Sequence, residues 1–457
     1  MNTANPVNWS SRLAFLMAAV GSAVGLANIW RFPFTAGVSG GGAFVIIYLF
    51  AVLLLALPLV IAELAIGRRG AAPPPRAIAT VAVESARSSH WGLMGIVLGS
   101  FGTTLALSFY AVVGGWTMAY VVHMASGDLQ GISTDTAQAI FGNLNEQVWV
   151  LLGWFTAFLG ATVMISMAGV RAGVERAVKL MMPALFLMLL VMVAYAARVG
   201  EFELALDFLF TPDFSQLNAH IVMAAFGQAF FSVSVGLTSM MAYGAYIQKS
   251  TSIPRSALII VLADTAVALL AGLAIFPIIF ANGLDPQAGP GLVFITLPCA
   301  FGQVPGGQVF GAVFFILLLF AALTSSIAML EAPVSWLCDR TRLKRKSAAL
   351  LTGAVAWILG LFAALSMNVL AGYHPLSGIP LFSDNTFFDL SDFLVINLMM
   401  PMGGILIAVF AGWMVKRKFS SEELYGDQPT FWYGVWRFLL RYVAPVVLVG
   451  VFLDMLR

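Results

Sequence analysis

Long runs of apolar residues alternate with short polar stretches along almost the whole chain. A helix needs about 20 mostly apolar residues to cross the hydrocarbon core of a bilayer. Eleven runs are long enough, and each predicts a membrane-spanning helix. The predicted helices cover residues 11–37, 41–67, 92–125, 147–169, 174–198, 220–247, 255–282, 305–336, 347–371, 390–416 and 432–455.

Composition indicates the solvent of these helices. The chain has 457 residues, of which 60% are hydrophobic and only 10% are charged. A soluble chain carries about 25% charged residues, so these few charges cannot cover a surface in water. We therefore expect an all-α membrane protein, one transmembrane domain over residues 1–457, with the lipid bilayer as its partner. A net charge of +2 gives no reason to expect a nucleic acid partner.

Basic residues are divided unevenly between the two sides of the predicted membrane. If the loops alternate sides, all of the 23 Lys and Arg residues except Arg31, Arg198 and Arg457 lie on the side of the N-terminus. Cytoplasmic loops are rich in Lys and Arg. The pattern therefore predicts a multi-pass protein of the cell inner membrane, with a cytoplasmic N-terminus and an external C-terminus. Nothing in the pattern indicates an oligomeric state.

Two of the predicted spans contain residues that interrupt helices. Residues 20–33 read VGSAVGLANIWRFP, and residues 227–239 read GQAFFSVSVGLTS. Glycine and asparagine are poor helix formers in the middle of a span. The first interruption opens a group of five spans (11–200) and the second opens another group of five (220–416), with 432–455 as an additional helix. Interruptions at matching places in two halves are typical of an inverted-repeat transporter.

Interrupted helices expose backbone groups that lipid cannot satisfy. Freed carbonyl groups can bind a cation, and freed N–H groups at a helix start can bind a carboxylate. A sodium ion together with a zwitterionic amino acid would satisfy both kinds of group. The alternative is a pair of simple kinks cushioned by neighbouring helices.

Five segments match a known family in order along the chain. They are GSAVGLANIWRFP at 21–33, SGGGAF at 39–44, GQAFFSVSVG at 227–236, GLVFITLP at 291–298 and LTSSIAM at 323–329. This set resembles the signature of the neurotransmitter:sodium symporter family, and the chain is similar to its bacterial amino acid transporters, such as the leucine transporter. The resemblance implies eleven transmembrane helices in a 5+5 inverted repeat with helices 1 and 6 broken. It also implies sodium-coupled symport of an amino acid.

The resemblance implies two sodium sites. The first would use the Ala23 carbonyl and the side chains of Asn28, Ser232 and Asp264. The second would use the carbonyls of Gly21, Val24 and Ala321 with the hydroxyls of Thr324 and Ser325. Sodium, like calcium, is a hard cation that prefers oxygen ligands. The alternative for the hydroxyl groups is hydrogen bonding between helices.

The resemblance also implies a substrate site. The carboxylate would meet the N–H groups of Leu26 and Ala27 and the Tyr110 hydroxyl, and the ammonium would meet carbonyls of Ala23, Phe231 and Ser232. The side-chain pocket would be formed by Ala106, Tyr110, Phe231, Ser234, Leu237 and Met329. No charge lines this pocket, so an ionised side chain would be poorly compensated. We expect a neutral, apolar amino acid, and the small Ala106 beside the adaptable Met329 leaves room for an aromatic one.

Two gates follow from the same resemblance. Arg31 and Asp392 would close the outer side over the substrate, with Phe231 as an aromatic lid. Trp9 and Asp339 would close the inner side. The family's N-terminal arginine that pairs with this aspartate is absent, and Pro6 stands in its place; Arg12 or another group would have to substitute. The alternative for Arg31 is a charge that extends to the outer surface.

Asp264 lies in an apolar run, where an ionised carboxylate needs a partner. In chloride-dependent relatives an anion supplies negative charge near this place, and Tyr48, Gln228 and Ser232 match the rest of that site. We expect Asp264 to supply the charge itself, so that chloride is not required. The alternative is a group that takes up and releases a proton. Glu63, at the end of another apolar run, is expected to accept hydrogen bonds from a broken helix.

No HExxH motif and no GxxxxGK[ST] loop is present in the chain, so we do not expect an enzyme or an ATPase. The sequence therefore predicts a sodium-coupled symporter that uses two sodium ions. A sensor of the same fold, which binds an amino acid without moving it, fits the same residues.

Overall fold

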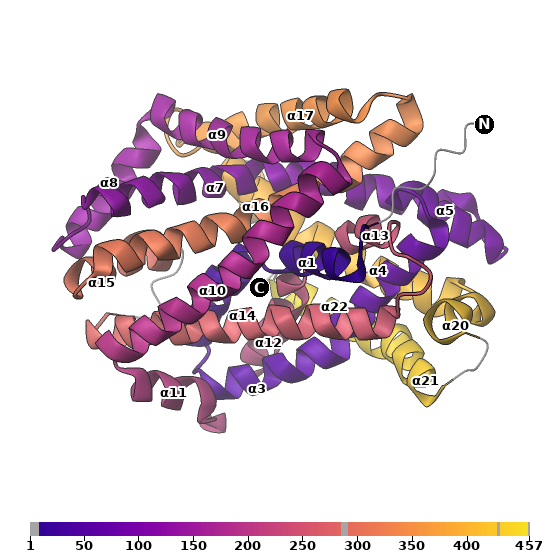
Figure 1. Cartoon of the computed structure of the whole chain (residues 1–457), viewed down its shortest axis with the longest axis horizontal. Helices are drawn as coiled ribbons and strands as arrows, with labels where there is room; N and C mark the ends of the chain where they lie inside the picture. Colours follow the sequence, from indigo (N-terminus) through magenta and orange to yellow (C-terminus); the bar gives the residue numbers. More distant parts are fainter. Residues whose placement is uncertain (1–8, 285–290, 427–429, 456–457) are drawn as a thin grey trace.

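The computed structural model describes residues 9–284, 291–426 and 430–455, and these residues form helices and turns with no β-strand. Nine helices among them are long and apolar enough to cross a membrane (Figure 1). They are Gly42–Gly70 (α3, Gly42–Ala51, and α4, Leu57–Gly70), Ser89–Ser126 (ending in α7, Thr103–Ser126), Val148–Met167 (α9), Val170–Val199 (ending in α10, Arg176–Val199), Ile253–Ala281 (α14), Gly307–Thr341 (α16), Arg345–Leu365 (α17), Phe387–Met414 (including α19, Met400–Val409) and Phe431–Met455 (α21, Phe431–Phe438, and α22, Ala444–Met455).

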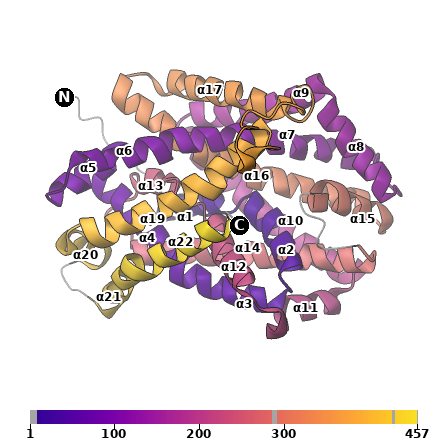
Figure 2. The same cartoon turned by 180° about the vertical axis from the view of Figure 1, so that it is seen from behind.

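Shorter helices connect or flank these long ones. They are α5 (Pro74–Glu84), α8 (Thr134–Glu146), α11 (Phe202–Phe210), α15 (Leu297–Gln303) and α20 (Arg417–Tyr425). In Figures 1 and 2, α5 and α20 lie at one end of the molecule, and α8, α11 and α15 lie at the other. The end with α5 and α20 therefore carries the basic residues of these two helices.

The predicted spans agree with the observed helices in nine of the eleven segments. The helix expected at 347–371 ends early, at Leu365, where Ser366 donates its N–H to Phe362. The segment predicted at 11–37 forms two helices that meet at an angle of 52°. The segment predicted at 220–247 is not one continuous helix, so a count of eleven spanning helices remains a prediction.

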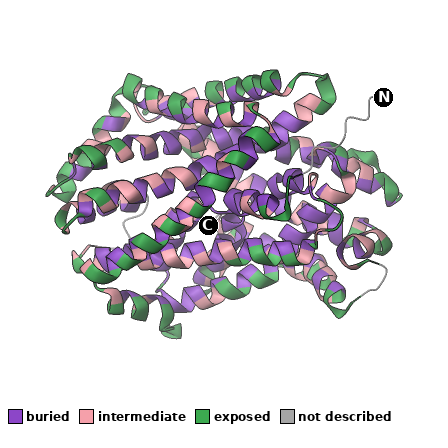
Figure 3. Ribbon diagram, viewed as in Figure 1, coloured by how far each residue is buried: buried purple, intermediate pink, exposed green. Residues whose placement is uncertain are grey.

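Helix α16 forms the centre of the packing. It contacts α7, α10, α17, α9 and α1, while α4 contacts α13 and α5 on the other side of the molecule. Buried residues concentrate around α1 in the middle of Figure 3, and exposed residues follow the outer faces of α9 and α17. The outer faces of helices that contact lipid are expected to be apolar. The division into two five-helix repeats stays a prediction.

The first interruption separates α1 (Arg12–Ala23) from the π-helix η1 (Ala27–Arg31) and α2 (Phe32–Val38). At Val24 the backbone turns to an extended conformation, with ψ of 110°. The turn falls within the glycine-rich stretch that the sequence marked as a poor helix.

The second interruption separates α12 (Ala219–Ser232) from α13 (Ser239–Gly244). Between them, Ser234, Gly236 and Thr238 all have positive φ, of 53°, 98° and 59°. Only glycine adopts this region easily, and an ordinary residue there costs about 1–3 kcal/mol. The surrounding structure must therefore hold Ser234 and Thr238 in place.

Glu63 on α4 holds the second interruption together. Its fully buried carboxylate accepts hydrogen bonds from the backbone N–H groups of Gly236, at 2.8 Å, and Met241, at 3.2 Å. These are N–H groups that the interrupted helix cannot satisfy by itself. The prediction that Glu63 accepts hydrogen bonds from a broken helix is confirmed.

Replacing Glu63 with alanine should lower the melting temperature of the detergent-purified protein, because each orphaned buried N–H costs about 1–3 kcal/mol. Glu63→Gln retains one acceptor and should lower it less. Thermal unfolding measured by fluorescence checks this order, with Glu203→Ala on the exposed surface of α11 as the control. A Glu63→Ala protein as stable as the control would contradict the assignment.

Candidate functional site

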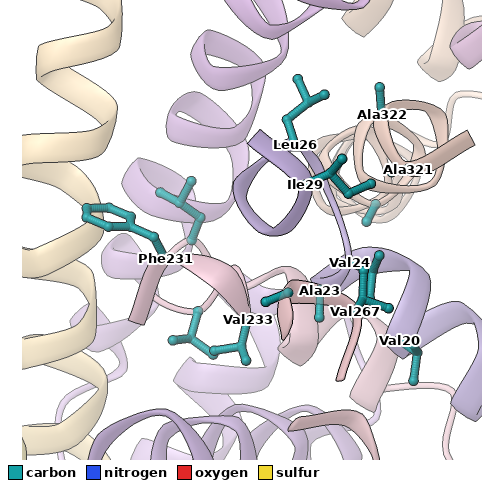
Figure 4. Packing of buried hydrophobic residues seen from close by; sticks show 14 of the residues in the cluster. Val20, Ala23, Val24, Leu26, Ile29, Phe231, Val233, Val267, Ala321 and Ala322 are labelled. Atoms are coloured by element: carbon teal, nitrogen blue, oxygen red, sulfur yellow. The ribbon is translucent and has the colours of Figure 1, made fainter. Parts of the chain in front are cut away.

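The two interruptions meet in the middle of the molecule, against α14 and α16. Helix α12 contacts η1, and Figure 4 shows Ala23, at the end of α1, next to Val233 of the second interruption. The amide of Gln228 on α12 donates a hydrogen bond of 3.0 Å to the carbonyl of Ala27. Backbone groups of one broken helix are therefore held by a side chain of the other.

The residues predicted for the first sodium site surround Asn28 and Asp264. The Asn28 amide donates to the Asp264 carboxylate at 2.8 Å and to its backbone carbonyl at 3.2 Å. Its oxygen accepts from the N–H of Gly25 at 3.0 Å. Ser232 faces the same carboxylate, and Ala23 ends the adjoining helix. All four predicted ligands lie in one buried region.

Several buried oxygen atoms of the site make no hydrogen bond of standard geometry among the described residues, although the Tyr48 hydroxyl faces Ser232 and Thr265. They are the second Asp264 carboxylate oxygen, the hydroxyls of Tyr48 and Thr265 and the side-chain carbonyl of Gln228. A buried polar atom without a partner costs about 1–3 kcal/mol. A cation or water coordinated by such oxygens would remove that cost. Tyr48, Gln228 and Ser232 are the three residues that the sequence matched to a chloride site.

The residues predicted for the second sodium site lie where α1 meets α16. The Ser325 hydroxyl donates to the carbonyl of Val24 at 3.2 Å. The Thr324 hydroxyl donates to the carbonyl of Ala321 at 3.0 Å. A methyl group added to Gly21 would lie 3.1 Å from the Thr324 side chain. The structure therefore brings together carbonyl and hydroxyl oxygens from both helices.

The predicted carboxylate site lies beside this second group of oxygens. Leu26 and Ala27 begin the π-helix η1, where N–H groups have no partner in the preceding turn. A methyl group added to Gly25 would lie 2.7 Å from the Ser325 hydroxyl and 3.5 Å from the Tyr110 hydroxyl. The Tyr110 hydroxyl faces the Ser325 hydroxyl and the backbone of Leu26, although it makes no hydrogen bond of standard geometry among the described residues. This hydroxyl therefore lies at the start of η1.

The predicted side-chain pocket draws on three regions of the chain. Ala106 and Tyr110 belong to α7, which packs on α16. Phe231, Ser234 and Leu237 belong to the second interruption, and Met329 belongs to α16. None of the six is charged, and Ala106, Phe231 and Leu237 are 3%, 5% and 5% exposed. The region suits an apolar group.

The predicted outer gate is only partly assembled. The Arg31 guanidinium lies 4.2 Å from the centre of the Phe231 ring, a cation–π contact. Arg31 and Asp392 interact through their charges, but they form no ion pair within 4.0 Å in the part of the chain that the structure describes. The structure brings Arg31 to the aromatic lid and leaves the carboxylate apart.

The predicted inner gate contains a partner that sequence reasoning did not find. Trp9 is buried, and its ring donates to the carbonyl of Tyr243 at 3.3 Å. Asp339 forms an ion pair of 2.6 Å with Arg76, on the loop helix α5, and not with Arg12. Of the two alternatives that the sequence left open, Arg12 or another group, the structure shows Asp339 paired with another group. From the sequence, the loop between the second and third spans, which contains Arg76, could be recognised only as basic.

Two further ion pairs near the inner gate were also missed. Glu331, which had no assigned role, pairs with Arg345 at 2.5 Å and accepts from the Tyr246 hydroxyl at 3.0 Å. Glu175 pairs with Lys179 at 2.6 Å and accepts from the hydroxyl of Ser10. Both carboxylates are almost completely buried. The sequence could have indicated that these carboxylates have partners, because buried charges are usually paired. It could not have indicated which residues those partners are.

Comparison with known proteins agrees with this geometry. The model of the sodium:neurotransmitter symporter family matches residues 7–139 and 138–457. The chain is 38% identical over 463 residues to an uncharacterized sodium-dependent transporter, YhdH, of Bacillus subtilis, covering 100% of this chain and 99% of that protein. It is 30% identical to an uncharacterized sodium-dependent transporter of Haemophilus influenzae, covering 98% and 97%.

A solved structure has the same fold. The crystal structure of MhsT in complex with L-phenylalanine superimposes with a TM-score of 0.87 and 36% sequence identity, over 98% of this chain and 99% of that one. The family match covers nearly every described residue, including both interruptions and the oxygen-rich region between them. The chain is therefore a multi-pass membrane protein that belongs to the sodium:neurotransmitter symporter family.

Proposed function

We propose that this protein carries a neutral, apolar amino acid into the cell together with two sodium ions, by alternating access and without a need for chloride. One observation supports the proposal above the others. The first interruption places Asn28 and Val24 in contact with Asp264 and Ser325, from two other helices, in a buried region that holds oxygen atoms without partners. Buried carbonyl, hydroxyl and carboxylate oxygens are the ligands that a hard cation such as sodium prefers.

The two ions would occupy the two groups of oxygens described above. One ion would bind the Ala23 carbonyl, Asn28, Ser232 and Asp264, and the other would bind the carbonyls of Gly21, Val24 and Ala321 with Thr324 and Ser325. Each ion would bridge at least two helices. Ion binding would then draw α1 toward α14 and α16, which couples it to the position of the broken helix.

The substrate would lie between the interruptions. Its carboxylate would accept from the N–H groups of Leu26 and Ala27 and from the buried Tyr110 hydroxyl, which faces Leu26 and Ser325. Its side chain would enter the uncharged region around Ala106, Phe231 and Met329, which favours an apolar or aromatic residue. The L-phenylalanine bound to the similar MhsT structure is consistent with that class.

The driving force would come from the sodium gradient and the membrane potential, which contributes about 2.3 kcal/mol per charge per 100 mV. The N-terminus would face the cytoplasm, because all but three of the 23 basic residues fall on its side of the alternating loops. In this orientation Arg31 and Asp392 face outward, and Trp9 and Asp339 face inward.

Uptake into proteoliposomes tests the proposed function. With sodium outside and potassium inside, labelled phenylalanine or leucine should accumulate, and an inside-negative potential should increase the rate. Replacing external sodium with potassium should abolish uptake, while replacing chloride with gluconate should leave it unchanged. Sodium-dependent binding without accumulation would instead indicate a sensor, and activity that needs no sodium would contradict the proposal.

Changing Asp264 to asparagine tests the source of the negative charge. The substitution keeps the shape of the group but removes its charge, so sodium-driven uptake should fall at least tenfold or should become stimulated by added chloride. Uptake measured with and without chloride checks both outcomes. If this variant behaves like the parent in both conditions, Asp264 does not replace chloride. A changed number of protons moved per cycle would favour the proton-carrying alternative.

Changing Gly25 to alanine tests the close approach of the first interruption to α16. The added methyl would lie 2.7 Å from the Ser325 hydroxyl, so the two groups must separate. The apparent affinity for sodium should fall at least tenfold in equilibrium binding measurements. Gly153→Ala is the matched control, because a methyl there meets no atom within 4 Å. Equal sodium affinities in the two variants would contradict the second ion site.

A further inference from the structure

An ion pair joins the loop helix α5 to the end of α16. The Arg76 guanidinium lies 2.6 Å from the Asp339 carboxylate, and the two side chains are 59% and 24% exposed. The two residues are far apart in sequence and belong to elements with few other contacts. The pair is therefore a specific link between two parts of the fold and not a consequence of neighbouring positions on one helix.

Arg76 is held on a rigid support. Helix α5 begins with Pro74 and Pro75, and proline at the first helical positions fixes the backbone. The support also packs closely against the following span, because a methyl added to Gly95 would lie 2.6 Å from the backbone of Pro75. A side chain on such a helix start is positioned with little backbone freedom.

The two residues of this link lie on helices that reach different parts of the candidate site. Helix α5 packs on α4, and α4 packs on α13, the second half of the second interruption. Trp9 contacts this same half, since its N–H donates to Tyr246 at 3.2 Å and its ring meets Tyr243 edge-on. Asp339 lies on α16, the helix that carries Thr324 and Ser325. The ion pair therefore adds a charged contact to the packing of α13 and α5 on α16.

Four other basic groups at this end have carboxylate partners of their own. Arg345 binds Glu331 and the backbone of Ser166. Lys179 binds Glu175, and Arg68 and Arg69 bind carboxylates of α20 and α5. Within the described residues, Arg76 is therefore the cation that Asp339 binds.

We propose that Arg76 is the cationic half of the inner gate, so that the loop between the second and third spans supplies the charge that closes the inner side through Asp339. The inference rests on the proposed function, because a gate has meaning only in a carrier that opens inward. Opening would break the Arg76–Asp339 pair and loosen the packing of α1 on α16.

Accessibility of a buried cysteine tests this gate without using substrate. Ser22, on α1, is 2% exposed and its hydroxyl has no partner among the described residues, so Ser22→Cys loses no hydrogen bond. The reporter would be placed in a Cys299→Ser, Cys338→Ser background and labelled with a membrane-impermeant maleimide in inside-out vesicles. Arg76→Ala should raise the labelling rate about two- to fivefold, the range expected for a partly exposed ion pair.

Three further variants make the test specific. Asp339→Ala should raise the rate as much as Arg76→Ala, and the double variant should be no faster than either alone. Arg76→Lys keeps the charge and should stay within about twofold of the parent. Exchanging the charges, with Arg76→Asp and Asp339→Arg together, should restore much of the protection. Arg87→Ala, an exposed arginine on the same loop, is the matched control.

Labelling of Arg76→Ala at the parental rate would overturn the proposal, whether or not Asp339→Ala labels faster. A double variant that labels much faster than either single variant would also overturn it, because the two residues would then act independently. Failure of the proposed function would look different. The parent would then show no sodium-driven uptake in proteoliposomes, whatever the labelling rates of these variants.

Discussion

The structure depends on one constraint, that backbone N–H and C=O groups away from water must have partners. Two helices in the middle of this molecule stop and restart, and each interruption frees such groups. At the second, the carboxylate of Glu63 accepts from two of the freed N–H groups. At the first, Asn28 of η1 accepts from the N–H of Gly25, and Gln228 and Ser325 donate to backbone carbonyls from two other helices. The remaining oxygens are those that a cation and a zwitterion would satisfy.

This arrangement explains why the site is spread over so many helices. An ion bound between Val24 and Ser325 would touch both a broken helix and α16, so its presence or absence changes how these helices fit together. Small residues are necessary for that contact. A methyl group added to Gly25 would lie only 2.7 Å from the Ser325 hydroxyl. Binding and movement would then depend on the same few contacts, which is how a carrier can couple two solutes.

Much of this could be predicted from the sequence, because hydrophobic runs and helix-breaking residues are local signals. Both interruptions and the role of Glu63 followed from composition and from the requirement for hydrogen-bond partners. The sequence marked residues 227–239 as an interruption, but composition does not reveal that Ser234 and Thr238 are the residues that adopt positive φ there. The partners of charged side chains were harder to predict from the sequence. Arg76, on a basic loop, gave no local sign that it would reach Asp339, because that pairing depends on how α5 packs.

Locating the bound ions tests most directly the claim that the two interrupted helices hold two cations. Thallium(I) substitutes for alkali cations and scatters X-rays anomalously, so crystals grown with thallium in place of sodium would reveal each site. The account predicts two peaks, one beside Asn28 and Asp264 and one between Val24 and Ser325, both lost in competition with excess sodium. Continuous helices through the two interruptions, or peaks only at the protein surface, would contradict it.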